Sequence, residues 1–253
     1  MSSLKLISLN IERSKHLDVV VPFLEREQAD VVNIQELLQH DVPRIAAATG
    51  AVDIVFTPMC RLKFEDPGAL YGTGIFSRVP VRERGEQYYV GQAGVIPESN
   101  ATELLTYNDE YRAVSWVTVE KDGTVFRVAT THFTWTPDGS ASDEQRQDMR
   151  NLMQILGTMG EFVLSGDFNA PRGGEMFSLL SSAYTDNIPP QYKTSLDLTL
   201  HRAARERGDQ LANKMVDGLF ATPGYTVSDV RLVDSVSDHM AIVATIQPAA
   251  QVR

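Results

Sequence analysis

Short segments in which apolar and polar residues alternate recur along the whole chain, and each predicts a β-strand. The alternation is clear over residues 4–11, and an apolar run covers residues 30–35. A period of two residues is that of a strand whose side chains face the two sides of a sheet. Similar patterns predict further strands at residues 51–57, 73–77, 111–120, 124–131, 161–165, 216–221, 226–233 and 239–246. Lys121-Asp122-Gly123 joins two of them and predicts a hairpin.

Helical spacing is less frequent. Apolar residues three and four positions apart predict helices at residues 16–28, 41–49, 142–159 and 175–182. Gly50 is a plausible C-cap of the second helix, and Ser142 or Asp143 can cap the third. Residues 183–214 are polar and irregular, so we expect a long active-site loop there rather than core.

The balance of elements predicts the fold class. Strands outnumber helices and many are joined by hairpins, which argues against a simple doubly wound parallel sheet. The pattern favours an α/β (α+β) protein in which two packed mixed β-sheets are flanked by helices. No linker-like Gly/Ser/Pro stretch divides the chain, so we expect a single domain over residues 1–253.

Composition and charge limit the choice of partner. The chain has 253 residues, and its 43% hydrophobic and 22% charged content is ordinary for a globular protein. A net charge of −10 argues against a broad basic face for sequence-independent DNA binding, although a local basic groove remains compatible with a nuclease. Cys60 is the only cysteine, and no secretory signal or membrane span is evident. We therefore expect a soluble, cytoplasmic monomer.

Candidate metal-binding residues follow the first two strands. Glu36 comes after an apolar strand, beside Gln35. A carboxylate there can be the principal ligand of Mg²⁺, which prefers one or two carboxylates plus water and phosphate oxygens. The alternative is a solvated Glu at a helix N-terminus. Asn10 ends the first strand and can lie beside the metal, or it can be a turn amide.

A second candidate motif is Gly166-Asp167-Phe168-Asn169. Asp167 can orient or deprotonate a water, and Asn169 can donate to a phosphoryl oxygen. The alternative is an Asx-turn, in which both side chains bond only to local backbone.

The third motif is Ser237-Asp238-His239. His239 can serve as a general acid or base near neutral pH. Adjacent strand residues point to opposite faces, so a separate acid rather than Asp238 should orient it, and Asp217 is the candidate. Asp217 can instead be a structural acid that accepts bonds from backbone amides.

Two strand-end residues complete the set. His132 can bind a phosphate oxygen, or it can be a strand-end His whose hydrogen bonds are satisfied locally. Arg112 opens a strand and can place a cation on the substrate phosphate, or it can be an exposed surface Arg.

The order of these motifs is more specific than any one of them. Together with Tyr71-Gly72-Thr73-Gly74-Ile75-Phe76-Ser77-Arg78, they span nearly the whole chain. The ordered set resembles the endonuclease/exonuclease/phosphatase superfamily, which includes exonuclease III-like, DNase I-like, sphingomyelinase and inositol polyphosphate 5-phosphatase enzymes. The resemblance implies a four-layer α/β sandwich with its site at one edge of the two sheets. It also implies Mg²⁺ or Mn²⁺ as cofactor, with Glu36 as ligand and with Asn10 and Asp238 helping to hold the metal and its waters.

The resemblance also implies catalytic roles. Asp167 corresponds to the residue that positions the water, and Asn169 to a phosphate donor. His239 corresponds to the catalytic His, paired with Asp217. His132 occupies the place where many members keep a phosphate-binding His and where abasic-site endonucleases differ, which argues against an abasic-site role.

Two features depart from the shared pattern. Gly218 stands where the family usually has an aromatic residue. A basic segment over residues 192–205 is not part of the pattern. We hypothesise that it reads the substrate, with Lys193 and Arg202 holding a second phosphate. The alternative is a solvated charged loop.

The expected activity is metal-dependent hydrolysis of a phosphodiester, first of all as a nuclease. The partner is then a phosphate-ester substrate, with nucleic acid as one option. The alternative is a phosphatase or phosphodiesterase acting on a small phosphorylated molecule or a lipid headgroup. A third reading is a non-catalytic binding protein of the same fold. Because every expected polar position is filled, the sequence favours an enzyme.

Overall fold

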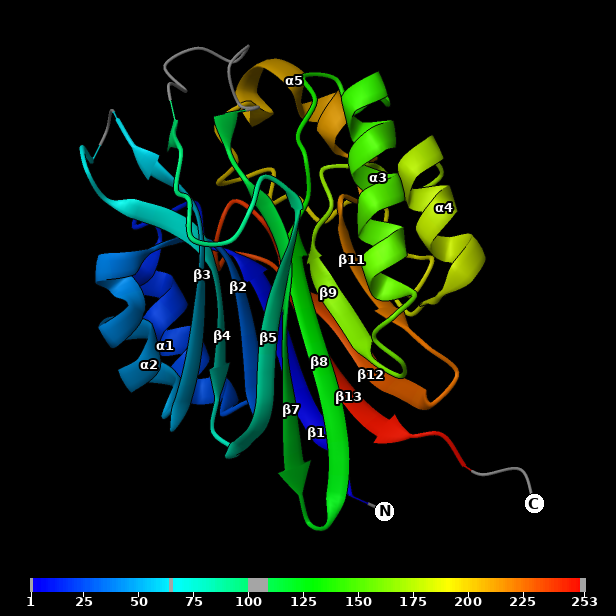
Figure 1. The fold of residues 1–253 in the computed structure, drawn as a ribbon. Helices are drawn as coiled ribbons and strands as arrows, with labels where there is room; N and C mark the ends of the chain where they lie inside the picture. Colours follow the sequence, from blue (N-terminus) through cyan, green and yellow to red (C-terminus); the bar gives the residue numbers. More distant parts are fainter. Residues whose placement is uncertain (1, 64–65, 100–108, 251–253) are drawn as a thin grey trace.

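Two β-sheets pack face to face at the centre of the molecule (Figure 1). A computed structural model describes residues 2–63, 66–99 and 109–250. The first sheet has seven strands in the order β12-β13-β1-β2-β4-β3-β6. Their bounds are β1 Leu4–Asn10, β2 Val31–Leu38, β3 Asp53–Leu62, β4 Leu70–Ser77, β6 Glu98–Ser99, β12 Tyr225–Val233 and β13 Ala241–Pro248.

The second sheet has six strands in the order β10-β11-β9-β8-β7-β5. Their bounds are β5 Val81–Val90, β7 Arg112–Lys121, β8 Thr124–His132, β9 Val163–Asp167, β10 Thr185–Asp186 and β11 Asp217–Ala221. In both sheets parallel pairs, β1 with β2 and β8 with β9, are combined with antiparallel neighbours. The prediction of two mixed sheets is confirmed.

Helices cover the outer faces of both sheets (Figure 1). They are α1 Leu17–Glu27, α2 Val42–Thr49, α3 Asp143–Leu156 and α4 Glu175–Ala183. Helix α5 Ala204–Leu211 lies at the top of the molecule in Figure 1, and a 3₁₀ turn η1 covers Gln39–Asp41. Helices α1 and α2 lie on the first sheet, and α3 and α4 lie on the second. Among the described residues, no helix is both long enough and apolar enough to cross a membrane.

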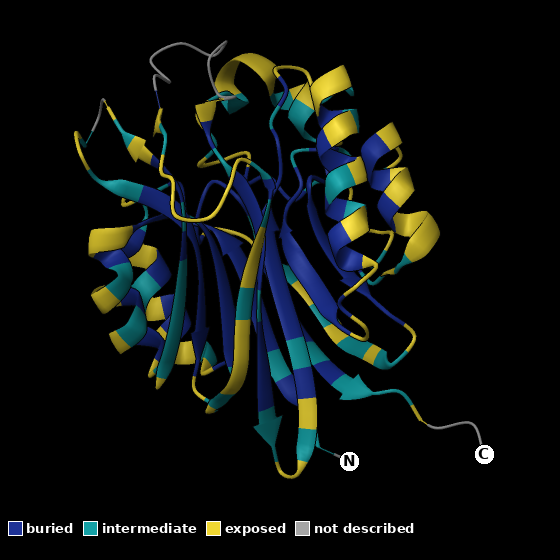
Figure 2. Ribbon diagram, viewed as in Figure 1, coloured by how far each residue is buried: buried dark blue, intermediate teal, exposed yellow. Residues whose placement is uncertain are grey.

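Three apolar layers hold these elements together. Phe23 and Ile45 pack between the helices and the first sheet, and Met149 and Phe177 do the same on the second. A middle layer, which contains Leu6, fills the space between the sheets. Figure 2 shows the central strands buried between the layers, with exposed residues on the helices and on the outer strands. The four-layer α/β sandwich is therefore confirmed, and its stability comes mainly from burial of these apolar side chains.

Local signals in the sequence explain several element ends. Gly50 ends α2 in the left-handed conformation, with φ 64°. Ser142 caps α3 by accepting a hydrogen bond from the Gln145 amide. Asp122 and Gly123 have φ of 50° and 74°, which lets two residues close the β7–β8 hairpin as predicted.

The structure corrects two expectations about elements. Strands β5 and β6 were not predicted, and β5 forms the edge of the second sheet against β7. Residues 183–214 are not a loop outside the core, because they contain β10 and α5 and bury Ser195, Leu196 and Asp197.

Candidate active site

The middle layer changes from apolar to polar along the strands. On β1, the residues that face the second sheet are Leu4, Leu6, Ser8 and Asn10. The parallel neighbour β2 changes in the same way, from Val31 to Asn33 and Gln35. In the second sheet, β8 runs from Val128 to Thr130 and His132, and β9 from Val163 to Ser165 and Asp167. Because parallel strands end at the same edge, their polar ends meet there.

Buried hydrogen bonds across the layer join the two sheets at this edge. Asn33 Nδ2 donates to Ser165 Oγ over 2.9 Å. Gln35 Nε2 donates to Thr130 Oγ1, also over 2.9 Å. Such paired polar groups offset the cost of burial and specify how the sheets meet. They form the floor of the group of side chains at the strand ends.

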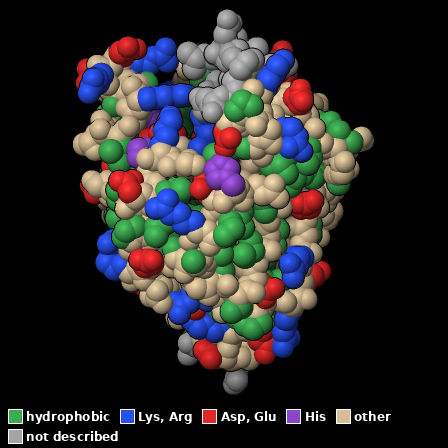
Figure 3. Space-filling model, turned by 90° about the vertical axis from the view of Figure 1, so that its left-hand side faces the viewer, with side chains coloured by type: hydrophobic (Ala, Val, Ile, Leu, Met, Phe, Trp, Pro, Cys, Tyr) green, Lys and Arg blue, Asp and Glu red, His purple; other side chains and the backbone are tan. Residues whose placement is uncertain are grey.

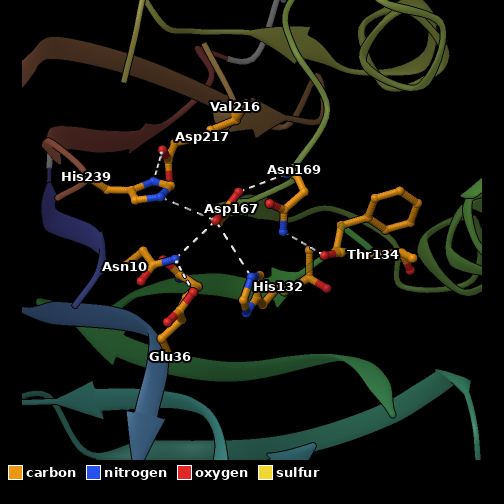
Figure 4. A network of polar contacts seen from close by, with 12 residues as sticks. Asn10, Glu36, His132, Thr134, Asp167, Asn169, Val216, Asp217 and His239 are labelled. Carbon is orange, nitrogen blue, oxygen red and sulfur yellow. Dashed lines mark hydrogen bonds and ion pairs between the residues drawn. The ribbon is translucent and has the colours of Figure 1, made fainter. Parts of the chain in front are cut away.

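Asp167 lies at the centre of that group (Figure 4). Its Oδ1 accepts the Asn169 amide over 2.8 Å, so the Asx-turn considered for this motif is present. Its Oδ2 is 3.1 Å from Asn10 Nδ2, 3.6 Å from His132 Nε2 and 3.8 Å from His239 Nε2. One carboxylate oxygen therefore stabilises the turn, while the other faces the polar side chains of both sheets.

Gly166 allows β8 and β9 to approach closely before this turn. A Cβ at Gly166 would lie 2.0 Å from the Thr131 carbonyl oxygen, which no side chain can tolerate. The backbone of β9 therefore stays in register with β8, and Asp167 lies opposite His132.

His239 is paired with Asp217 across the site (Figure 4). Its Nδ1 donates to Asp217 Oδ2 over 2.7 Å. Asp217 reaches this position because β11 pairs with β9, where it lies opposite Asp167. Burial by itself would lower the pKa of His239, but the charges of Asp217 and Asp167 raise it well above its usual value. These charges favour the protonated ring, and its Nε2 lies 3.8 Å from Asp167 Oδ2.

The two other titratable groups at the centre differ in charge. Burial, with a smaller effect of Asp217, raises the pKa of Asp167 to about 7. Burial also lowers the pKa of His132 well below its usual value, helped by Arg112 and His239. The surroundings thus shift the pKa of the two histidines in opposite directions and raise that of Asp167, and such divergent shifts are typical of functional sites.

The metal-ligand candidates lie beside Asn10. Its Nδ2 also donates to Glu36 Oε1 over 3.2 Å, so this amide bridges Glu36 and Asp167. Glu36 is not at a helix N-terminus. It lies at a bulge of β2, with φ 56°, where the register against β4 shifts. Burial and the nearby charge of Asp238 raise the pKa of Glu36.

Glu12 was missed by the sequence analysis. It is buried, with φ 45°, and its carboxylate is 3.0 Å from His16 Nε2. Ligand atoms of Glu12, His16 and Asp238 all lie within 4.8 Å of one another. Glu12 lies beyond the end of β1 in the left-handed conformation, so the alternation of the strand gives no signal for it.

The donor atoms fit a hard divalent cation. Asp238 is buried and Glu36 is half-buried, their charges repel each other, and a bound cation relieves that repulsion. Carboxylate oxygens are the ligands that Mg²⁺ and Mn²⁺ prefer.

Asn169 and Arg112, two of the candidate phosphate-binding residues, each donate a hydrogen bond to the main chain. Asn169 Nδ2 donates to the Phe133 carbonyl over 2.9 Å. Arg112 is not an exposed surface residue: it is 2% exposed and pairs with Glu110 over 3.0 Å. Its Nη1 donates to the His132 carbonyl over 3.3 Å. Arg112 thus contacts the main chain of a site residue.

The two candidate substrate-binding residues of the basic segment lie on the surface. Lys193 is exposed, and its ammonium donates to the Pro190 carbonyl over 2.8 Å. Arg202 is also exposed and makes contacts of its own. The contacts recorded for the described residues do not join Lys193 to the central group.

Gly218 leaves space that other side chains fill. A Cβ at Gly218 would lie 2.6 Å from the Phe220 ring and 2.8 Å from the Phe168 ring. These two rings pack edge to face beneath Asp217. The aromatic wall near Asp217 is therefore built from neighbouring residues rather than from the position after the Asp.

Comparison with known proteins agrees with this geometry. The profile of the Endonuclease/Exonuclease/phosphatase family matches residues 7–239. No match was found among curated protein sequences.

Solved structures share the fold at low sequence identity. An endonuclease/exonuclease/phosphatase from Bacteroides vulgatus superposes with a TM-score of 0.72 and 17% identity, covering 98% of this chain and 100% of that one. One from Beutenbergia cavernae gives 0.71 and 19%, covering 99% and 72%. A mannosyl-6-phosphatase from Bacteroides thetaiotaomicron gives 0.62 and 14%, covering 98% and 100%. The profile match and the shared fold show that this chain belongs to the endonuclease/exonuclease/phosphatase family of phosphoesterases.

Proposed function

We propose that this protein is a divalent-metal-dependent hydrolase that cleaves a phosphodiester, with a nucleic acid as substrate. One observation carries the proposal. Asp167 Oδ2 accepts a hydrogen bond from Asn10 and faces His132 and His239. Asp217 is hydrogen-bonded to the other ring nitrogen of His239. A base, a cation and a neutral donor around one small space are the groups that in-line attack on phosphorus requires.

The proposed cofactor is Mg²⁺ or Mn²⁺. Glu36 and Asp238 would hold it, with Asn10 orienting Glu36 through the 3.2 Å hydrogen bond. When bound, the ion stabilises negative charge that develops on phosphoryl oxygens.

Asp167 is the proposed general base. Its pKa of about 7 suits proton abstraction from a water at neutral pH. The Asx-turn and the Asn10 amide hold the carboxylate in one orientation. The water that it orients would attack phosphorus from the side facing Oδ2.

His239, His132 and Asn169 are proposed to bind the phosphate. His239 is cationic and offers Nε2–H to a phosphoryl or leaving oxygen, while Asp217 fixes its ring. His132 is neutral and offers a hydrogen bond without adding charge. We further propose that Arg112 positions His132 through its carbonyl, and that Lys193 and Arg202 hold a second phosphate farther out.

The surface supports an anionic substrate. Basic side chains gather in the upper part of the face drawn in Figure 3, where histidine and acidic side chains also lie. The lower part of that face mixes both signs. Localised basic groups can contact a few phosphates despite the net charge of −10.

A small phosphorylated molecule is the second candidate substrate. Lys193 and Lys214 donate to the carbonyls of Pro190 and Asp138, which reduces their availability for a long polyanion. The likeness to a mannosyl-6-phosphatase shows only the fold, but it makes sugar phosphates a reasonable group of compounds to test.

The test is a hydrolysis panel with Mg²⁺ or Mn²⁺. It contains single- and double-stranded DNA, RNA, bis-p-nitrophenyl phosphate, p-nitrophenyl phosphate, sugar phosphates and inositol phosphates. We expect metal-dependent cleavage that is strongest on a nucleic acid and is lost in Asp167→Ala. Asp143→Ala is the matched control, because Asp143 is fully exposed on α3. Preference for a monoester would select the second candidate, and inactivity with every compound would contradict the proposal.

A further inference from the structure

Part of the basic segment over residues 192–205 is hydrogen-bonded to the backbone at the catalytic edge of the sheets. Met240 N donates to the Ser195 carbonyl over 2.7 Å, and Asp197 N donates to the Asp238 carbonyl over 2.8 Å. Leu196 thereby forms a β-bridge with His239. The backbone that carries Asp238 and His239 is therefore paired with this segment as with an additional short strand.

Ser195 ties the same segment to Asp217. Its Oγ accepts the amides of Val216 and Asp217, each over 3.1 Å, and its side chain is fully buried. The segment therefore contacts both members of the His239–Asp217 pair through their main chains. Such fixed contacts limit motion of this part of the chain relative to the site.

Asp197 turns the chain back toward the site. Its Oδ1 accepts the amide and the hydroxyl of Thr199, and its Oδ2 accepts the Ser235 amide over 2.6 Å. The His201 amide then donates to the Asp197 carbonyl over 2.8 Å. These hydrogen bonds fix the turn and thereby the position of the His201 backbone.

The His201 ring lies beside the catalytic His. The centroids of His201 and His239 are 6.5 Å apart, with an angle of 50° between the rings. Asp238 and Glu12 are close enough to act on its charge. His201 Nδ1 accepts the Ala203 amide over 3.2 Å, so the proton of the neutral ring is on Nε2. Nε2–H is thus a donor at the rim of the site.

We propose that His201 is a substrate-binding residue that donates Nε2–H to a phosphoryl oxygen of the ester bound against His239. A centroid separation of 6.5 Å is compatible with one phosphoryl oxygen that accepts a hydrogen bond of about 2.8 Å from each ring. The segment over residues 195–201 holds His201 in place, so its contribution is binding rather than proton transfer. This inference rests on the proposed phosphoesterase function and adds a ligand from the basic segment over residues 192–205.

The test compares steady-state kinetics of His201→Ala and His201→Gln on the preferred substrate. Loss of one hydrogen bond to a charged oxygen should raise KM by about tenfold or more and leave kcat within about threefold. Gln keeps an amide donor near the position of Nε2 and should restore most of the affinity. His40→Ala removes an exposed imidazole elsewhere and should match wild type.

Two results would overturn the inference while leaving the function intact. One is a KM for His201→Ala within twofold of wild type. The other is an equal loss in the Ala and Gln variants at unchanged melting temperature, because that excludes the donor role.

An inactive wild-type protein would instead contradict the proposed function. In that case a titration with inorganic phosphate, followed by the imidazole ¹⁵N resonances, decides on His201. A saturable shift of His201 without a shift of His40 supports the inference, and an unmoved His201 resonance overturns it.

Discussion

The two ends of the layer between the sheets are built from the same strands but differ in chemistry. At one end, Leu6 and Val163 belong to a fully buried apolar cluster. At the other end, Asn10 and Asp167 on the same two strands are equally buried but polar. At the apolar end, burial of the side chains stabilises the folded state. At the polar end, burial disfavours the charged forms of the side chains. Stability and chemistry are thus placed at opposite ends of common strands, and a rigid apolar layer positions the reactive groups.

The largest effect should come from His239 at the polar end. His239→Ala should lower kcat by about 10³-fold or more, because it removes the cation that faces the phosphate. Asp217→Asn keeps the ring and should cost less, about 10- to 100-fold. The double variant should be no worse than His239→Ala, since Asp217 acts through His239. Additive losses would show that Asp217 has a separate role.

A substitution at the apolar end should affect stability and leave catalysis intact. Leu6→Ala removes a fully buried side chain and should lower the free energy of unfolding by about 3 kcal/mol. Urea denaturation measures this loss, and kcat of the folded variant should stay within twofold. Leu179→Ala, at an exposed position on α4, is the control and should change stability by less than about 0.5 kcal/mol. A large fall in kcat for Leu6→Ala would contradict the conclusion that the apolar end serves stability and the polar end serves catalysis.

The charge of Asp167 should cost stability in the metal-free protein. Burial raises its pKa from 3.8 to about 7, so the folded state holds the proton more tightly than the unfolded chain. Stability is therefore lost as pH rises between these two values. Asp167→Asn should gain about 3 kcal/mol more stability over wild type at pH 8 than at pH 5. Urea denaturation in EDTA measures the gain, and Asp143→Asn is the control. If Asp167→Asn and wild type differ in free energy of unfolding by the same amount at both pH values, the raised pKa of Asp167 is refuted.

Metal binding should have the smallest effect on stability. Mg²⁺ at about ten times its dissociation constant should stabilise the protein by about 1.4 kcal/mol. Glu36→Gln should abolish this gain, whereas Glu25→Gln, on the exposed face of α1, should keep it. Thermal unfolding with and without Mg²⁺ measures both. Undiminished stabilisation of Glu36→Gln would place the ion elsewhere.

Much of the site could be predicted because its residues follow strands with a clear pattern. Asn10 and Asp167 end their strands, His239 precedes β13, and Glu36 lies at a bulge near the end of β2. Local alternation identifies those strands. The rule that adjacent strand residues face opposite sides excluded Asp238 as the partner of His239, and the structure places the candidate Asp217 2.7 Å from the ring. Their roles in catalysis stay predictions.

Other features depend on contacts that local sequence does not contain. Strand β5 has few buried residues and several charges, so its pairing with β7 rather than an apolar period defines it. Ser195 and Asp197 look like loop residues, and their burial results from pairing with Asp238 and Met240. The burial and pairing of Arg112 with Glu110 likewise require the tertiary fold.

The most direct test of the central claim is the rate of Mg²⁺-dependent phosphodiester hydrolysis in Asp167→Asn relative to wild type, with Asp143→Asn as control. The substitution keeps the shape and the Asx-turn acceptor but removes the base. We predict that turnover falls by at least about 10³-fold while the variant remains folded and the control keeps wild-type activity. Turnover of Asp167→Asn within tenfold of wild type would contradict the account.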